Sequence, residues 1–178
     1  MKKIALAMFL LTTAVSLNAQ KYFTKNATIV FQNKGPLETI EGTNKTTTSV
    51  IDSKTGAIAF SVLVKGFVFE KQLMQKHFNE NYMQSDKFPK AEFKGTISNN
   101  ASVKYTTDGV YNATVTGKLT LHGVTKDISA SGKITVAGGK VSATADFSVA
   151  LADYNISSDR ISKTVTISVK TGNMDKLK

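Results

Sequence analysis

The chain has 178 residues, contains no cysteine, and carries 23 Lys and Arg residues against 13 Asp and Glu residues, for a formal net charge of +10. A chain without cysteine has no disulfide bond, no thiolate nucleophile and no thiolate metal site. The positive charge does not predict a nucleic-acid partner, because Arg160 is the only arginine and the lysines are scattered, whereas phosphate recognition favours clustered arginines.

The N-terminus has the pattern of a secretory signal peptide. Lys2 and Lys3 precede a short apolar run, and Ala19 supplies a small residue before a cut ahead of Gln20. The run is too short to span a membrane, and no later segment is apolar for long enough to do so. We expect residues 1–19 to be a cleaved signal peptide. Residues 20–178 then form one domain, periplasmic or secreted, without a cysteine-linked lipid anchor.

The first part of this domain is extended. Residues 27–32 and 37–52 are two extended runs, and apolar residues then alternate with others over residues 58–64. Alternation with a period of two predicts a strand with one buried face. We therefore expect three strands in this part of the chain.

Residues 66–95 contain the only helical-looking passage. Met74, Phe78 and Tyr82 recur at every fourth position, so they form one apolar stripe on a helix. Pro89 forbids further helix and returns the chain to an extended form. We expect an amphipathic helix that covers one end of the sheet.

The rest of the chain alternates again. The remaining strands are expected at about residues 91–97, 111–121, 128–136, 141–151 and 165–169. Eight antiparallel strands with short glycine turns form either a sandwich or a closed barrel, so the fold class is all-β.

Many inward positions of these strands carry small side chains. They are Gly95, Ala113, Gly117, Ala130, Gly132, Ala143 and Ala145. An eight-stranded barrel is just wide enough for side chains to fill, so small inward residues leave room for a ligand. We favour an elongated apolar cavity; the alternative is a core that large neighbours or the helix fill.

Groups for catalysis or cofactor binding are sparse. His122 lies at the end of a strand, and His77 has Glu70 and Glu80 near one face of the expected helix, a weak arrangement for a metal. No nucleophile-elbow, phosphate-loop or zinc-protease motif occurs. We expect no enzyme activity, no metal and no cofactor.

Three segments resemble the YceI-like family. The run from Val115 to Lys126 is similar to the family's strand ending in Leu-x-Leu-x-Gly-Val-Thr-Lys, Ser85–Phe93 to its passage after the helix, and Phe147–Ile156 to its late strand and loop. The resemblance implies an extended eight-stranded antiparallel lipocalin-like β-barrel, with one helix inserted between the third and fourth strands. It also implies an apolar tunnel for an isoprenoid or other amphiphilic lipid in a periplasmic protein.

We therefore hypothesise an exported, non-enzymatic protein that holds an amphiphilic lipid of the polyisoprenoid or isoprenoid quinone class. The expected tunnel residues are Phe60, Phe93, Val115, Leu119, Ile134, Phe147 and Val149. The expected closing residues come from the helix and the segment before it: Phe67, Phe69, Leu73, Met74, Phe78 and Tyr82. Tyr154 and Ile156 are expected at a mouth.

The main partner is thus an amphiphilic isoprenoid-type lipid. Transient contact with a membrane surface and a homodimer are left open as further partners. The alternative function is an envelope or surface interaction module with a filled barrel core and no ligand.

Overall fold

The computed structural model describes residues 20–35, 38–157, 159 and 161–177. Its strands are β1 (Lys21–Lys34), β2 (Thr39–Asp52), β3 (Ala57–Leu63), β4 (Lys90–Ile97), β5 (Gly109–Leu121), β6 (Val124–Ala137), β7 (Lys140–Ala150), β8 (Thr164–Lys170) and β9 (Asp175–Lys176). Its helical elements are η1 (Val64–Gly66), α1 (Gln72–His77), η2 (Phe78–Tyr82), η3 (Asn100–Ser102) and η4 (Leu151–Tyr154). The expected signal peptide lies outside the described residues.

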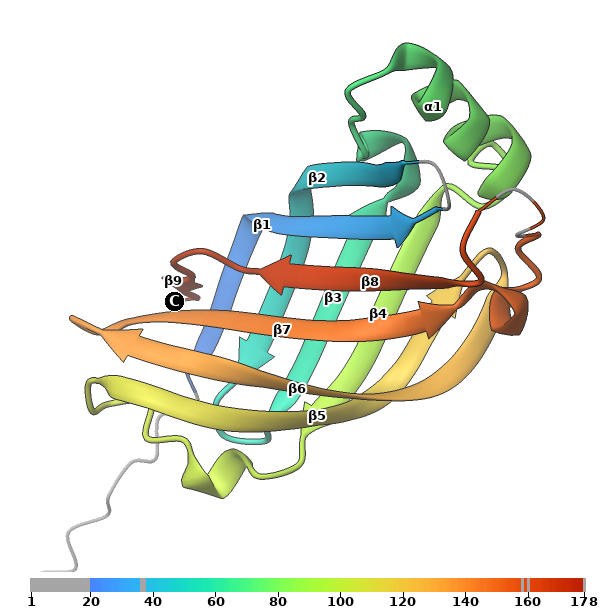
Figure 1. The fold of residues 1–178 in the computed structure, drawn as a ribbon. Coiled ribbons are helices and arrows are strands. Elements are labelled where there is room, and N and C mark those ends of the chain that lie inside the picture. Colours follow the sequence, from blue (N-terminus) through green and yellow to red (C-terminus); the bar gives the residue numbers. More distant parts are fainter. Residues whose placement is uncertain (1–19, 36–37, 158, 160, 178) are drawn as a thin grey trace, which may run out of the picture.

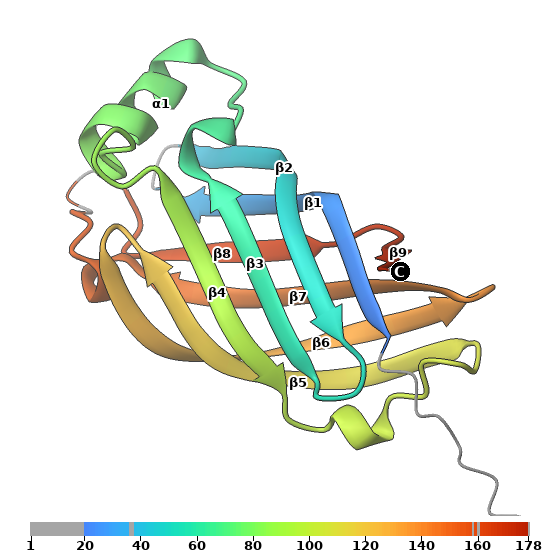
Figure 2. The same cartoon turned by 180° about the vertical axis from the view of Figure 1, so that it is seen from behind.

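Eight of these strands form a closed antiparallel barrel (Figures 1 and 2). The order β2-β3-β4-β5-β6-β7-β8-β1 is closed by pairing of β1 with β2. The short β9 adds to the start of β1, where Tyr22 pairs with Lys176. The predicted eight-stranded antiparallel barrel, with one helix between the third and fourth strands, is confirmed.

The long β5–β6 hairpin shows why the alternating sequence forms these strands. Its register runs unbroken from Gly109 opposite Val136 to Leu121 opposite Val124. The turn residues, His122 and Gly123, have φ angles of 51° and 76°. Positive φ at both central residues gives the turn a twist that matches the twist of the flanking strands. The hairpin is therefore continuous to its tip.

Strand β1 is longer than the sequence predicted, and a bulge explains the difference. Its register with β2 shifts between Thr24 and Ala27 and again between Ala27 and Ile29. Each extra residue in a bulge breaks the period of two along the strand. The alternation therefore begins afresh at Ala27, and the pattern does not reveal the earlier part of the strand.

The helix is shorter than its apolar stripe suggested. Regular α-helix ends at His77, and the chain continues through one π-helical stretch to Tyr82. Lys71 precedes α1 without a side-chain cap, and neither helical stretch contains a fully buried residue. Figures 1 and 2 place this helical segment over one end of the barrel, away from the C-terminus.

The opposite end of the barrel is closed by packed side chains. Tyr22 and Tyr105 stack there with ring centroids 5.8 Å apart, and both belong to a cluster that includes the fully buried Ile51 and Val141. Access to the interior is therefore to be sought at the α1 end. Among the described residues, no helix has the length and apolar character needed to cross a membrane.

Candidate functional site: two apolar cavities under the helix

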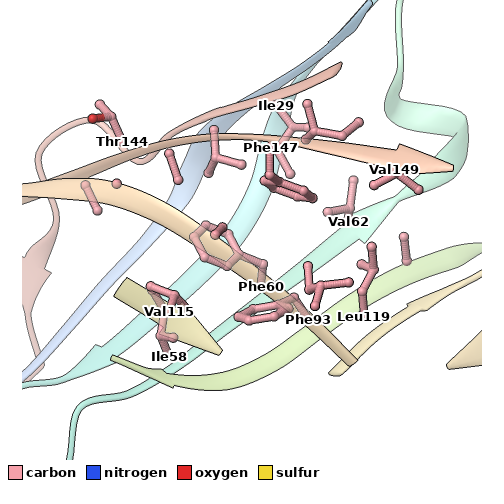
Figure 3. Close-up of a pocket in the computed structure, with 18 of the residues that line it drawn as sticks. Ile29, Ile58, Phe60, Val62, Phe93, Val115, Leu119, Thr144, Phe147 and Val149 are labelled. Atoms are coloured by element: carbon pink, nitrogen blue, oxygen red, sulfur yellow. The ribbon is translucent and has the colours of Figure 1, made fainter. Parts of the chain in front are cut away.

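An inner cavity of about 160 Å³ lies inside the barrel. Its wall is formed by apolar side chains from most of the strands, and Figure 3 shows Phe60, Phe93, Leu119, Phe147 and Val149 turned toward this space. Alternation supplies this arrangement, because every second residue of each strand faces inward. A space with such walls suits hydrocarbon and offers little to hold a polar group.

An outer cavity of about 520 Å³ lies between the barrel end and the helical segment. Met74, Phe78 and Tyr82 line it from the helical side, while Phe31 and Ile156 line it from the barrel side. This volume falls within the range of about 300–1,000 Å³ that is usual for small-molecule sites, whereas the inner cavity is smaller. The expected elongated cavity is thus present as two separate spaces.

The two cavities share part of their walls. Phe67, Leu121, Val165 and Ile167 line both. Phe67 is the only aromatic side chain among these four. The shared side chains mark the boundary between the spaces.

Four phenylalanines pack together at this boundary. Phe78 stacks on Phe31 with ring centroids 5.2 Å apart, and its ring also lies 5.5 Å from that of Phe67 and 5.0 Å from that of Phe69. Phe31 in turn makes edge contacts with Phe67 and Phe69, both at 5.5 Å. Aromatic pairs at these separations attract one another beyond their apolar burial. The cluster therefore plugs the barrel end in this structure.

The rim of the outer cavity carries polar groups that already have partners. Lys71 Nζ lies 2.8 Å from Glu38 Oε2, and this hydrogen bond raises the pKa of Lys71. The Asn33 amide nitrogen donates to the Ser162 carbonyl oxygen at 2.8 Å, and His77 Nδ1 lies 3.1 Å from Asn81 Oδ1. Exposed charged groups of the site thus lie at the rim of the outer cavity, whereas Asn33 is buried.

The structure places the sequence-predicted site residues in two groups. Phe60, Phe67, Phe93, Val115, Leu119, Ile134, Phe147 and Val149 line the inner cavity. Phe67, Phe69, Leu73, Met74, Phe78, Tyr82 and Ile156 line the outer cavity. Their contacts with a ligand stay a prediction.

Tyr154 lines neither cavity. It is 2% exposed and packs in a cluster with Met83 and Leu151. Its carbonyl oxygen accepts a hydrogen bond from His122 Nδ1 at 3.0 Å, and burial raises the pKa of its phenol. Because a carbonyl can only accept, the Nδ1 atom of His122 carries the hydrogen. The two residues join the β5–β6 turn to η4.

Several lining residues were not singled out from the sequence. Phe31 is the most central, since it touches the other three rings of the plug. Its spacing from Ala27 and Ile29 in β1 was the available signal, because residues two apart share a face. Leu121, Val165 and Ile167 also follow their strands' inward pattern.

The inward glycines do not open the volume that the sequence suggested. A Cβ atom added to Gly117 would lie 2.8 Å from Cζ of Phe93, and one added to Gly95 would lie 2.6 Å from the same atom. The Phe93 ring thus lies across both glycines, which are paired with each other in neighbouring strands. Close approach of the strands and a large neighbour fill this space, and that explains the small inner cavity.

The described residues contain no group of three or more His, Asp or Glu side chains that could hold a metal ion. The site as it stands is a pair of hydrocarbon-lined spaces with a polar rim. Such a site can take up an apolar chain and leave a polar head near solvent.

Comparisons with known proteins agree with this architecture. The YceI-like domain model matches residues 16–172. Among functionally curated proteins, no match is found.

Solved structures with the same fold include the following three. A polyisoprenoid binding domain from Saccharophagus degradans, implicated in plant cell wall breakdown, has a TM-score of 0.73 and 11% identity, covering 85% of this chain and 96% of that one. Burkholderia cenocepacia BcnA has a TM-score of 0.67 and 15% identity, covering 81% and 94%. Campylobacter jejuni YCEI protein has a TM-score of 0.56 and 16% identity, covering 100% and 99%. At these identities the likeness shows the fold alone.

Proposed function

The chain belongs to the YceI-like domain family, and from this premise we propose that it is an exported, non-enzymatic protein that binds an amphiphilic lipid of the polyisoprenoid or isoprenoid quinone class. The observation that carries the proposal is the outer cavity of about 520 Å³, which shares an apolar wall with the cavity inside the barrel. The binding of a polyisoprenoid by the Saccharophagus degradans domain, which has the same fold, supports the choice of lipid class.

Burial of the lipid tail would drive binding. Each CH₂ group removed from water contributes about 0.8 kcal/mol, so a short isoprenoid tail already supplies enough free energy for measurable affinity. The head group would stay at the rim near Lys71, Glu38 and His77, because the inner wall is apolar. Apolar walls and a polar rim match the two ends of an amphiphile.

Organic extraction of the purified protein, followed by mass spectrometry, tests the proposal directly. We expect a co-purified isoprenoid lipid, and saturable uptake of farnesol by the delipidated protein. Recovery of no amphiphile together with no saturable uptake of any prenyl alcohol would sink the proposal.

Two substitutions that each introduce a negative charge test whether the lipid binds in the outer cavity. Met74→Glu places a carboxylate in the outer cavity wall, whereas Val68→Glu places one on an exposed side chain that does not line this cavity. A charge next to hydrocarbon costs free energy because it loses water. We expect Met74→Glu to lower farnesol affinity by about tenfold or more, with Val68→Glu close to the wild type. Equal effects of the two variants would place the binding elsewhere.

Export is a separate part of the proposal. The basic start and apolar run of residues 1–19 support it. Intact-mass analysis of the protein recovered from the cell envelope fraction should give a chain that begins at Gln20. A chain that retains Met1 in the cytoplasmic fraction would contradict export.

Membrane contact and dimerisation complete the expected partners. After cleavage before Gln20 the chain keeps 21 Lys and Arg residues against 13 Asp and Glu residues, a formal net charge of +8 that supports transient contact with anionic bilayers. The exposed side chains of Leu63, Val68 and Leu73 offer apolar contacts. Co-sedimentation with anionic vesicles that is lost at high salt would support this contact; no binding at low salt would contradict it. The homodimer stays a prediction that analytical ultracentrifugation measures.

One observation favours the alternative, an interaction module with a filled core. The inner cavity of about 160 Å³ is below the usual size of a ligand site, since Phe93 covers the inward glycines. Absence of any extracted lipid, together with capture of a defined envelope partner, would favour this function instead.

A further inference from the structure

The wall between the two cavities contains one large side chain that could separate them. Phe67 lines both cavities, whereas Phe31, Phe69 and Phe78 line only the outer one. The other members of the shared wall are aliphatic residues of β5 and β8: Leu121, Val165 and Ile167. A tail that passes from the outer to the inner cavity passes between these four side chains, and the Phe67 ring is the largest of them.

The backbone of Phe67 is held in place on the barrel. The next residue, Val68, exchanges two backbone hydrogen bonds with Thr43 of β2, at 3.0 and 2.9 Å. The preceding η1 is tied in by the bond from the Val64 amide to the Pro89 carbonyl oxygen at 2.9 Å. The backbone is thus hydrogen-bonded to the barrel on both sides of Phe67. The part of Phe67 that can move is therefore its ring.

The Phe67 ring contacts one aromatic residue on a barrel strand and one on the helical segment. Phe31 belongs to β1, a barrel strand, and its ring centroid lies 5.5 Å from that of Phe67. Phe78 lies at the same centroid distance but belongs to the helical segment, which has no fully buried residue. Displacement of Phe78 with the helix would free one side of the Phe67 ring.

We propose that Phe67 is the residue that sets the length of tail the protein accepts, an inference that rests on the lipid-binding function proposed above. A short tail fills the outer cavity without disturbing the ring. A longer tail must turn the Phe67 ring aside before its end reaches the inner cavity, which is itself only about as large as a cavity that takes benzene. The protein thus discriminates among amphiphiles with the same head by the length of their tails.

We predict that the affinity for prenyl alcohols rises steeply with tail length for short tails and less steeply for longer tails. Each buried CH₂ group increases affinity by roughly fourfold. For the wild type, we expect this gain along geraniol and farnesol while the outer cavity fills. The gain per CH₂ should then become smaller for geranylgeraniol and longer polyprenols, because further groups must displace Phe67.

Two phenylalanines two residues apart offer a matched pair of variants. Phe67 and Phe69 are 8% and 7% exposed, they belong to the same cluster, and their replacement by alanine removes the same ring. Of these two phenylalanines, Phe67 lines both cavities and Phe69 lines the outer one alone. Phe67→Ala should restore the gain of roughly fourfold per CH₂ for the longer polyprenols, whereas Phe69→Ala should keep the smaller gain of the wild type. Titration of delipidated protein with the prenyl alcohol series measures both.

The shared wall provides a second variant if Phe67→Ala does not fold. Leu121→Ala widens the same boundary from β5, so it should change the gain for longer tails in the same direction. Circular dichroism and thermal melting establish that each variant used is folded.

The outcomes separate the inference from the function on which it rests. Saturable binding with an even gain per CH₂ across all lengths in the wild type, or equal effects of Phe67→Ala and Phe69→Ala, overturns the role of Phe67 and leaves lipid binding standing. No saturable binding of any prenyl alcohol overturns both.

Discussion

At the scale of single residues, one tyrosine carries a pH-dependent part of the stability. The Tyr105 hydroxyl donates to Asn100 Oδ1 at 2.8 Å, and its ring stacks on Tyr22 in the closed end of the barrel. Burial raises the pKa of Tyr105 well above its ordinary value, and nearby Tyr22 and Asp52 add to the shift. The folded protein therefore keeps this proton at a pH where the unfolded chain has lost it.

The free energy of unfolding should consequently fall as pH rises above about 10, the pKa of an unfolded tyrosine. Below that pH both states hold the proton, and the contribution of Tyr105 is fully present. Tyr105→Phe should make the decline between pH 9 and 11 shallower in urea denaturation, while Tyr111→Phe, whose hydroxyl bonds to Thr107 near the surface, should not. An unchanged decline in Tyr105→Phe would contradict the assignment.

A second residue-scale result concerns the glycines under Phe93. A Cβ at Gly117 would meet the Gly95 Cα and the Lys94 carbonyl oxygen of the neighbouring strand. Gly117→Ala should destabilise the protein by about 1–3 kcal/mol, because the strand backbones must move apart. Gly109→Ala on the same strand is the control, since its nearest neighbour is the end of the Tyr111 side chain at 3.2 Å. Equal unfolding free energies for the two variants would show that the strands can relax.

At the scale of elements, the helical segment is held at the barrel end through its apolar face. Its apolar stripe of Met74, Phe78 and Tyr82 faces the outer cavity, and α1 lacks a side-chain cap at Lys71. Most of a short helix's stability comes from packing of its apolar face, since isolated helices of this length do not persist in water. The contacts of Phe78 with the plug therefore hold the segment in place.

Loss of these contacts should loosen the segment alone. Phe78→Ala should speed amide hydrogen exchange of residues 72–82 by about tenfold or more, with the exchange of β5 and β6 unchanged. Leu73→Ala is the matched control, because Leu73 belongs to the same helical segment but is 64% exposed. Hydrogen exchange measured by mass spectrometry tests this prediction. Faster exchange to the same extent in the barrel strands would contradict it, because it would show that Phe78 stabilises the whole barrel and not the helical segment alone.

At the scale of the whole molecule, ligand uptake and stability are linked. The barrel is closed by pairing of β1 with β2 and β8, and both cavities are lined by residues of several strands. A lipid that binds these walls binds only the folded state, so it stabilises that state by mass action.

Farnesol at a hundredfold excess over its Kd should raise the free energy of unfolding by about 2.7 kcal/mol. For a chain of this size, the melting temperature should rise by roughly 5–10 °C. Differential scanning calorimetry with and without farnesol measures the shift. Met74→Glu, with an affinity about tenfold lower or less, should show about half of the shift or less at the same farnesol concentration. An unchanged melting temperature in the wild type would contradict binding to the folded barrel.

The sequence by itself determined the strands, their order and the position of the helix. Alternation marks the inward face of a strand from local residue order alone, and this is why it assigns Phe60, Phe93 and Phe147 to the interior. The pattern missed the first part of β1, where a bulge shifts the period, and the short β9.

The tertiary structure alone decided how much space remains inside. Volume depends on side chains from strands far apart in sequence, as when Phe93 covers Gly95 and Gly117. It also depends on how Phe31 of β1 meets Phe67, Phe69 and Phe78 from the insertion between β3 and β4. Alternation with a period of two indicates which face of the strand a residue lies on, but it does not indicate which side chains the residue will contact. For this reason the sequence predicts one tunnel, whereas the structure has two cavities that share the wall containing Phe67.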